Sequence, residues 1–360
     1  MPQEKALIAM SGGVDSSVAA YLMQRAGFQC AGATMRLCDN ALLGQQESIC
    51  CSLDDTEDAR SVAYRLGMHF YVFNHTADFR SMVVDKFIRC YEEGGTPNPC
   101  IDCNRHLKFD ALLTKAITLG YDCIVTGHYA KIQKDETSGR YLLYRAADRS
   151  KDQTYFLSCL TQHQLAHTKF PLGELTKEQV RQIAAEQGFI NARKRDSQDI
   201  CFIPDGDYKT FMERYTQKQY PAGDYLDLEG NVVGKHSGAV GYTLGQRKGL
   251  GIAMGEPVYV CGKDMQKNTV TVGPNEALFR TELRANDWNW IPFPALTQPL
   301  RVTAKVRYRH TEQPATVYPV DGGFARVVFD EPQRAITTGQ AVVLYDGDLV
   351  IGGGTITQVL

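Results

Sequence analysis

The first half of the chain alternates short apolar runs with segments of helical periodicity. Residues 5–10 form an apolar run typical of a buried strand, and a helical pattern then begins at residues 11–17 and ends at Gly27. Further strands are predicted at residues 30–35, 69–73 and 123–127, and further helices at residues 54–67 and 105–120. Such alternation is typical of a parallel sheet that helices cover on both faces.

The pattern changes beyond about residue 210, where helical periodicity fades and glycine and proline become frequent. Residues 300–308 alternate strictly between apolar and polar side chains, as a half-buried strand does. We therefore expect an α/β domain over residues 1–206, a small middle domain over residues 207–284, and a barrel or sandwich of roughly six strands over residues 285–360.

The composition is that of a protein with real hydrophobic cores. Of its 360 residues, 43% are hydrophobic and 22% are charged, which excludes a disordered chain or a small disulfide-bonded scaffold. No run approaches the ~20 apolar residues that cross a bilayer, and residues 6–10 are shorter than the ~7–15 apolar residues of a signal peptide. We expect a cytoplasmic protein without a membrane partner.

Charge gives no global sign of a nucleic-acid partner, because 39 basic residues face 41 acidic ones. A polyanion would therefore have to bind to local clusters of basic side chains. Alternation along residues 300–308 places Arg301, Lys305 and Arg307 on one face of the strand, although a solvated outer face would look the same. Two more basic groups are residues 193–195 and the set Arg140, Arg145, Arg149 and Lys151.

The string SGGVDSS at residues 11–17 is the first candidate site. It joins a strand to a helix, where backbone N–H groups and the helix dipole attract an anion and glycines let the backbone close around a phosphate. A GxxxxGK[ST] loop is absent, which disfavours ordinary γ-phosphoryl transfer. The string resembles the pyrophosphate loop of ATP pyrophosphatases, which adenylate a carbonyl oxygen and release pyrophosphate.

Cysteines form the second candidate site. Eleven of them, without an export signal, do not predict a disulfide framework. Cys100 and Cys103 form a CxxC in a predicted loop, which suits redox or sulfur chemistry or half of a metal site. Cys201 follows the basic residues 193–195, which favour its nucleophilic thiolate form. Cys50 and Cys51 form a further pair without an assigned role.

Several separated motifs together resemble the tRNA-specific 2-thiouridylases, which replace the 2-oxygen of the wobble uridine with sulfur. They are SGGVDSS, NPCIDCNRHLKF, TGHYA, KDQTYFL, DSQDICFIP, HSGAVGYTLGQRKGLGI and KVRYRH, in that order along nearly the whole chain. The resemblance implies an ATP pyrophosphatase domain of the adenine-nucleotide alpha hydrolase type, a central linker domain and a tRNA-binding β-barrel. It also implies ATP with Mg²⁺, a tRNA substrate and a sulfur donor, either a cysteine desulfurase or a relay protein.

The resemblance further implies roles for individual residues. Cys103 would be the nucleophile and Cys201 the persulfide carrier, and the two would form a transient disulfide. The implied ATP contacts are Ala9, Met10, Ser11, Gly12, Gly13, Val14, Asp15, Ser16, Met35 and Gly127. The implied tRNA contacts are Asn98, Pro99, Cys100, Lys151, Asp152, Gln153, Arg307 and Tyr308.

Some members of the family carry an aspartate, proposed as an acid or base, at the position of Cys100. Because this chain has a cysteine there, the proton-transfer role is not assigned to any residue. A third thiol leaves two chemistries open: a persulfide on Cys201, or an iron–sulfur cluster held by Cys100, Cys103 and Cys201. Two other functions remain as alternatives. An amide-forming synthetase would share the ATP site without needing the cysteines, and a non-enzymatic RNA-binding protein would leave the phosphate loop unused.

Overall fold

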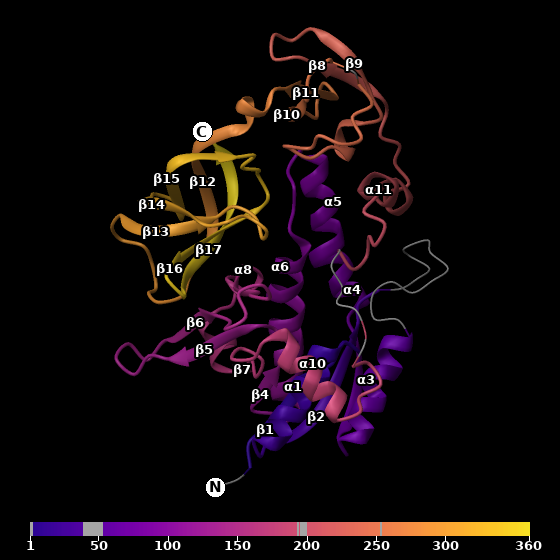
Figure 1. Ribbon diagram of the computed structural model, residues 1–360, viewed down its shortest axis with the longest axis vertical. Coiled ribbons are helices and arrows are strands. Elements are labelled where there is room, and N and C mark those ends of the chain that lie inside the picture. Colours follow the sequence, from indigo (N-terminus) through magenta and orange to yellow (C-terminus); the bar gives the residue numbers. More distant parts are fainter. Residues whose placement is uncertain (1–2, 39–52, 193, 195–199, 253) are drawn as a thin grey trace.

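The computed structural model in Figure 1 describes residues 3–38, 53–192, 194, 200–252 and 254–360. The chain forms an α/β domain with a parallel sheet, a middle domain built on a four-stranded sheet, and a closed C-terminal β-barrel. The fold class predicted from the sequence is therefore confirmed. Cys50 and Cys51, together with most of the segment before Cys201, lie outside the described residues.

The parallel sheet has the strand order β3-β2-β1-β4-β7. Its strands are β1 (Lys5–Ala9), β2 (Gln29–Arg36), β3 (His69–Asn74), β4 (Cys123–Val125) and β7 (Thr168–Lys169). β1 lies at the centre, where Leu7 pairs with Ala31 on one side and Ile124 on the other. Because the strand is flanked on both edges and covered on both faces, its three middle residues are fully buried.

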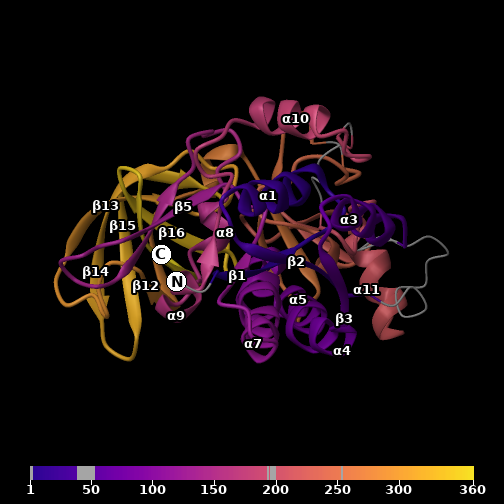
Figure 2. The ribbon, with the colours of Figure 1, turned by 90° about the horizontal axis from the view of Figure 1, so that it is seen from below.

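Helices cover both faces of this sheet, as Figure 2 shows. α1 (Val14–Arg25), α3 (Leu53–Arg65) and α10 (Lys177–Glu186) share one hydrophobic cluster, and α5 (Asp85–Glu92) and α7 (Leu112–Thr118) belong to the other. The other helices include α4 (Thr76–Phe79), α8 (Thr154–Leu157), α9 (Gln162–Ala166) and α11 (Tyr208–Thr216). α1 ends before Gly27, whose φ of +90° favours glycine.

The CxxC lies in a helix, and the prediction of a loop there is wrong. α6 (Pro99–Cys103) begins with Pro99 in its first turn, a position that suits proline because its missing N–H would have no partner. The chain continues without a break as a π-helix, η2 (Asn104–Ala111), and then as α7. A second π-helix, η1 (Arg80–Val84), precedes α5 and contacts α6. The helix predicted from residue 105 is thus about two turns longer at its N-terminus.

The middle domain follows α11, whose N-cap is Asp207. Its strands are β8 (Gly223–Leu226), β9 (Val232–His236), β10 (Tyr259–Asp264) and β11 (Thr269–Gly273), in the order β10-β11-β8-β9. Tyr225 is fully buried in this domain's own small core, which also contains Tyr242 and Val260. The short helices η3 (Ala239–Gly241) and η4 (Asn275–Leu278) complete the chain path to the barrel.

Six strands form the barrel in the order β12-β15-β14-β13-β16-β17, and pairing of β12 with β17 closes it. They are β12 (Phe279–Trp290), β13 (Leu300–Lys305), β14 (Gln313–Val320), β15 (Phe324–Arg334), β16 (Ala341–Asp346) and β17 (Leu349–Val359). The expected boundary at residue 285 lies inside β12. β13 alternates as predicted but ends at Lys305, so Arg307 and Tyr308 lie in the turn that follows it.

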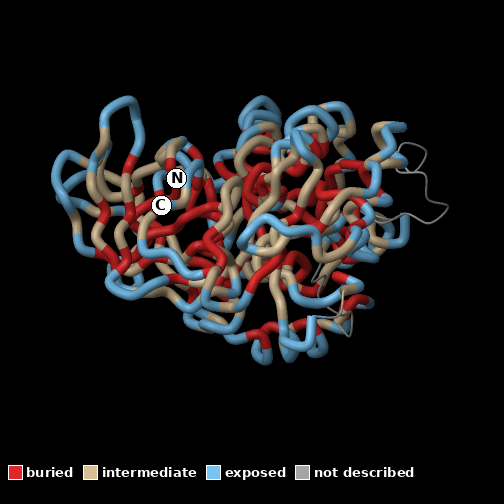
Figure 3. The backbone as a smooth tube through the Cα atoms, turned by 90° about the horizontal axis from the view of Figure 1, so that it is seen from above, coloured by how far each residue is buried: buried red, intermediate tan, exposed pale blue. Residues whose placement is uncertain are grey.

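A hairpin of the α/β domain extends the barrel sheet. β5 (Ala130–Lys134) and β6 (Tyr141–Arg145) pair with each other, and Tyr144 of β6 pairs with Leu349 of β17. Figure 3 shows buried backbone continuing from the parallel sheet toward the barrel. The first and last parts of the chain are therefore joined through a shared, partly buried interface.

Because β1 lies at the centre of the sheet, truncating a side chain in β1 should lower the free energy of unfolding more than truncating one in the edge strand β3. Ile8→Ala should lower the free energy of unfolding by about 2–5 kcal/mol, because Ile8 is fully buried and truncation leaves a cavity. Val72→Ala on the edge strand β3, where the side chain is 47% exposed, should cost less than about 0.5 kcal/mol. Urea unfolding followed by circular dichroism compares the two variants, and equal losses would contradict the placement of β1.

Candidate active site

The turn between β1 and α1 presents unoccupied backbone donors. Gly13 is the N-cap of α1 and has no side chain with which to cap it, and the N–H groups of Val14 and Asp15 have no acceptor among the described residues. The Ser16 hydroxyl donates to the Gly13 carbonyl at 3.0 Å and accepts from the Ser11 N–H at 3.3 Å. The turn is thus held in shape while the helix N-terminus stays available for an anion.

Two positions around this turn have no room for any side chain and therefore require glycine. Gly12 has a φ of +75°, and a Cβ there would lie 2.2 Å from the Asp55 carbonyl oxygen. A Cβ on Gly127 would lie 2.7 Å from backbone atoms of Asp15 and Ser16. Ala9, Met10, the turn, Met35 at the end of β2 and Gly127 after β4 are therefore brought together at the carboxyl edge of the sheet.

Sequence reasoning missed the residues that fix Asp15. The Lys177 ammonium donates to both carboxylate oxygens of Asp15 at 2.8 Å, and the Tyr129 hydroxyl donates to one of them at 2.9 Å. Lys177 begins α10 and is buried, so this ion pair ties α10 to the first turn of α1. The Asp15 side chain is thus committed to protein partners, and its backbone N–H is the group left for a ligand.

A buried amide supports the same turn from another direction. The Asn191 side chain donates to the Gly12 carbonyl and to the Ser17 hydroxyl, both at 2.9 Å. Lys194 pairs with Asp55 and Asp58 of α3 at 2.6 and 2.7 Å. Burial alone would lower the pKa of Lys194, but the two carboxylates outweigh it and raise the pKa. Within residues 193–195, Lys194 is therefore internally paired, and the two arginines lie outside the described residues.

Two of the three candidate thiols lie near each other. Cys100 is exposed on α6, yet the atoms packed around its sulfur desolvate it, and with the nearby Cys201 thiol they raise the pKa of Cys100 to about 11. Cys201 is also exposed, whereas Cys103 is buried in the hydrophobic cluster of α5 and α7. None of the nine described cysteines is joined to another by a disulfide. The Cys103–Cys201 disulfide stays a prediction.

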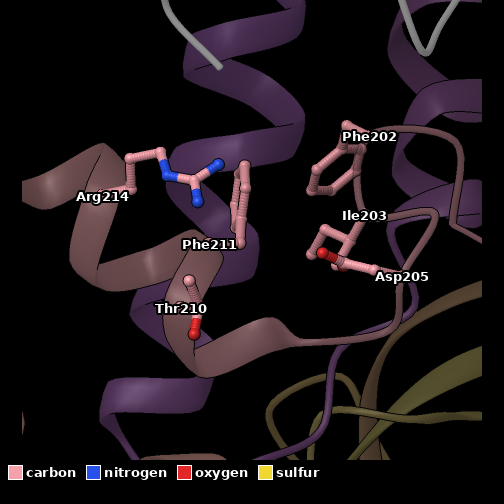
Figure 4. A pocket seen from close by; sticks show the side chains of 6 residues that line it. All are labelled: Phe202, Ile203, Asp205, Thr210, Phe211 and Arg214. Atoms are coloured by element: carbon pink, nitrogen blue, oxygen red, sulfur yellow. The ribbon is translucent and has the colours of Figure 1, made fainter. Parts of the chain in front are cut away.

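Aromatic packing anchors the chain directly after Cys201. Phe202 is almost fully buried, and its ring lies 5.6 Å from Phe79, 5.3 Å from Phe87 and 5.4 Å from Phe211. Figure 4 shows Phe202 and Phe211 on either side of a small hollow. Its volume of about 10 Å³ has room for one water at most, so it serves packing rather than ligand binding.

Lys108 on η2 links the thiols to the phosphate turn. Its charge acts on Cys100, where it lowers the pKa, and also on His128, which directly follows Gly127. Burial and then Lys108 hold the pKa of His128 well below its usual value, so the ring is neutral at pH 7. Lys108 thus lies within electrostatic range of both Cys100 and the residue that follows Gly127.

The described residues do not form a metal site. Although they include Cys100, Cys103 and Cys201, no three of their His, Cys, Asp or Glu side chains lie close enough together to hold a metal ion. The three cysteines thus do not fit an iron–sulfur cluster in this arrangement. The same holds for the carboxylates around Gly12, so Mg²⁺ stays an expectation that accompanies ATP.

Several of the residues that the family resemblance implies as tRNA contacts lie close together where the α/β domain contacts the barrel. The Tyr308 ring lies 4.4 Å from the Phe156 ring and close to Lys151 and Asp152, whose charges act on its hydroxyl. Buried Tyr155 connects Asn98, which hydrogen-bonds to it, with Arg307. The Asp152 carboxylate is already used, since it accepts from the Ala146 N–H and the Thr154 hydroxyl at 3.0 and 2.6 Å. The Gln153 side-chain oxygen likewise accepts from the Tyr129 N–H.

Four of the cations that the sequence offered as RNA-binding groups bind groups of the protein instead. Arg145 pairs with Glu312 and lies over the Tyr345 ring, and Arg149 pairs with Asp348. Arg140 donates to the carbonyls of Ile291 and Trp290 at 2.8 and 3.2 Å. These three arginines dock the β5–β6 hairpin onto the barrel. On β13, Arg301 is neutralised by Asp330.

Comparison with known proteins agrees with this arrangement along the whole chain. Residues 4–205 match the family described as tRNA methyl transferase HUP domain, residues 209–274 its PRC-barrel domain, and residues 280–356 the aminomethyltransferase beta-barrel domain. The tRNA-specific 2-thiouridylase MnmA of Clostridioides difficile is 50% identical over 99% of both chains. That of Clostridium acetobutylicum is 51% identical over 98% of this chain and 99% of its own.

The chain belongs to the tRNA-specific 2-thiouridylase family. Full-length relatives at this identity outweigh the words "methyl transferase" in the domain descriptions, which name parts of the chain. The structure of a 4-thiouridine synthetase–RNA complex with bound ATP aligns with 56% of this chain and 45% of its own, at 18% identity and a TM-score of 0.35, too low to support an argument. As in the sequence, no described helix is long and apolar enough to span a bilayer.

Proposed function

We propose that this member of the 2-thiouridylase family thiolates the wobble uridine of tRNA at position 2, with ATP as the activating substrate and a cysteine persulfide as the sulfur source. One observation carries the proposal: the chain has an uncapped phosphate-binding turn and a pair of nearby thiols, Cys100 and Cys201, and the charge of Lys108 acts both on Cys100 and on His128, which follows Gly127. Neither feature alone specifies the reaction. Together they supply an adenylation site beside a sulfur-transfer site.

ATP binds with its pyrophosphate over Gly12, Gly13 and Ser16, where the free N–H groups of α1 and the helix dipole neutralise developing negative charge. Ala9, Met10, Met35 and Gly127 enclose the nucleoside end at the same sheet edge. The uridine is turned out of the anticodon stack, because its 2-oxygen is otherwise hard to reach. That oxygen attacks the α-phosphorus, pyrophosphate leaves, and carbon 2 carries AMP as a good leaving group.

The sulfur step uses Cys201 and Cys103. A sulfur donor, by class a cysteine desulfurase or relay protein, leaves a terminal sulfur on Cys201. That sulfur attacks carbon 2 and AMP departs, while the Cys103 thiolate attacks the Cys201 sulfur and forms a Cys103–Cys201 disulfide. Alternatively, Cys103 attacks first and releases sulfide, which then displaces AMP. Both routes leave the same disulfide, which an external dithiol must reduce.

The tRNA lies against the meeting point of the α/β domain and the barrel. Tyr308 offers an aromatic face for an unstacked base, and Lys305 and Arg307 offer charge to the backbone. Burial lowers the pKa of both cations, and each also lies near another cation, Arg145 or Arg334. A phosphate there would relieve that repulsion. Cys100, Pro99 and Asn98 face the same substrate from α6.

An amide-forming synthetase would use the same ATP site but would not require Cys103 and Cys201. A simple RNA-binding protein would not release pyrophosphate. Thiolation of an unmodified tRNA transcript, with ATP and a persulfide donor, tests the proposal against both, and absence of 2-thiouridine in the product would refute it.

The first prediction concerns Gly13. Its backbone is extended and an added Cβ meets only the Ser11 hydroxyl at 3.5 Å, so Gly13→Val should fold. The isopropyl group should nevertheless block close approach of phosphate and reduce pyrophosphate release at least 100-fold. Gly241→Val in the middle domain, where an added Cβ also has 3.5 Å of clearance, is the matched control. Unchanged pyrophosphate release by Gly13→Val would contradict the ATP assignment.

A second prediction separates the roles of the thiols. Cys201→Ser should fail to accept sulfur, whereas Cys103→Ser should accept it on Cys201 and then stop, because a hydroxyl cannot attack the sulfur–sulfur bond. Cys100→Ser should keep partial activity. Cys30→Ser is the control, because Cys30 lies at the start of β2, at the other end of the strand from Met35. Intact-protein mass spectrometry detects the added sulfur, and sulfur retained by Cys201→Ser would overturn the assignment.

A third prediction concerns the RNA-facing cations. Lys305→Ala and Arg307→Ala should each weaken tRNA binding several-fold and reduce the salt slope of binding by about one, because one phosphate-bound counterion fewer is released. Arg301→Ala, which removes an arginine already neutralised by Asp330, should leave the slope unchanged. Filter binding over a range of salt concentrations measures the slopes. Three equal slopes would argue against RNA contacts at this turn.

A further inference from the structure

A cavity of about 290 Å³ lies where all three domains meet. Gly94, at the end of α5, contributes one wall, and Cys261 and Lys263 of β10 contribute another. The barrel adds Arg280 of β12 and Thr338 from the turn after β15. The volume is close to the lower end of ligand pockets, ~300–1,000 Å³, and suits a small charged group rather than a folded segment.

The cavity wall carries positive charge without a matching carboxylate. Lys263 and Arg280 both line it, and no acidic residue does. Within the described parts of the chain, neither cation forms an ion pair: the Lys263 ammonium donates to the Tyr242 carbonyl at 2.8 Å, and Arg280 donates to the carbonyls of Ala277 and Phe279. This contrasts with Arg145 and Arg301, whose charges are neutralised.

The surroundings of Lys263 make an unpaired ammonium unfavourable. Its nitrogen lies 5.9 Å from the centre of the Tyr91 ring, and burial lowers the pKa of Lys263 to about 8, while the nearby Cys90 thiol partly opposes this shift. A half-buried cation without a counterion loses part of its hydration, and no ion pair compensates for that loss. An anion in the cavity would supply that counterion, and Arg280, which is exposed, could reach the same anion from the solvent side.

We propose that this cavity is a second phosphate-binding site, separate from the Ser11–Ser17 turn. The backbone of the bound tRNA is the source that the charges favour. Arg307 donates to the Arg334 carbonyl at 3.3 Å, and the charge of Arg334 also acts on Cys261 in the cavity wall, so Arg334 lies within electrostatic range of both places. This choice of source rests on the proposed function. A free phosphate compound is the other source with the same chemistry.

The RNA source is tested by tRNA binding to Lys263→Met, Lys263→Arg and Arg280→Gln over a range of salt concentrations. The site predicts about tenfold weaker binding for Lys263→Met and Arg280→Gln, with a salt slope lower by about one, and near-normal binding for Lys263→Arg. Arg301→Gln is the matched control and should bind as the parent does. Circular dichroism verifies folding, and the exposed Arg280 provides a variant that does not disturb the core.

The free-phosphate source is tested by calorimetric titration of inorganic pyrophosphate into Gly13→Val, in which the first site is disabled. Binding that disappears on adding Lys263→Met would support the cavity with a free ligand as its source. If the parent protein failed to bind tRNA, the proposed function would fail, but this titration would still decide the cavity. The proposed site would be refuted if Lys263→Met and Arg280→Gln folded and kept the parent's salt slope of tRNA binding, and if Gly13→Val did not bind pyrophosphate.

Discussion

The parallel pairing of β1 between β2 and β4 is the constraint on which the site depends. Adjacent parallel strands end at the same edge of a sheet, and the chain adds β2 and β3 on one side of β1 before it crosses to form β4 on the other side. Such a switch point opens a crevice at the carboxyl edge. The Ser11–Ser17 turn, Met35 and Gly127 meet there because of strand order, although more than 100 residues separate the first from the last. Close packing of Gly127 on Asp15 leaves no room for a side chain between them.

Docking of the barrel is the second requirement, and it occupies several arginines of the α/β domain. Arg145, Arg149 and Arg140 bind groups of the barrel, and the Tyr155 hydroxyl donates to the Ala341 carbonyl at 2.9 Å. These contacts hold Tyr308 against Phe156 of α8. Electrostatic attraction of RNA is therefore left to fewer cations than the sequence contains, Lys305 and Arg307 among them.

Local patterns predicted much of this architecture. Apolar runs and glycine positions indicated β1 to β4 and α1, and strict alternation indicated β13, because these signals depend only on neighbours along the chain; the two-residue strand β7 is too short to leave such a signal. The start of α6 was missed although Pro99 is a recognised first-turn residue. Pairings such as Lys177 with Asp15 join residues 162 positions apart. The periodicity of a sequence carries no information about such a pair. The contacts that support the phosphate turn and the ion pair of Arg149 could therefore be identified only in the folded structure.

The nucleoside content of cellular tRNA is the most direct test of the proposed ATP-dependent sulfur transfer to the wobble uridine. Mass spectrometry of tRNA from cells that lack this chain should show loss of 2-thiouridine at the wobble position. The parent gene should restore it, and the Cys201→Ser variant, expressed at the same level, should not. Normal 2-thiouridine in the deleted cells, or full restoration by Cys201→Ser, would contradict the account.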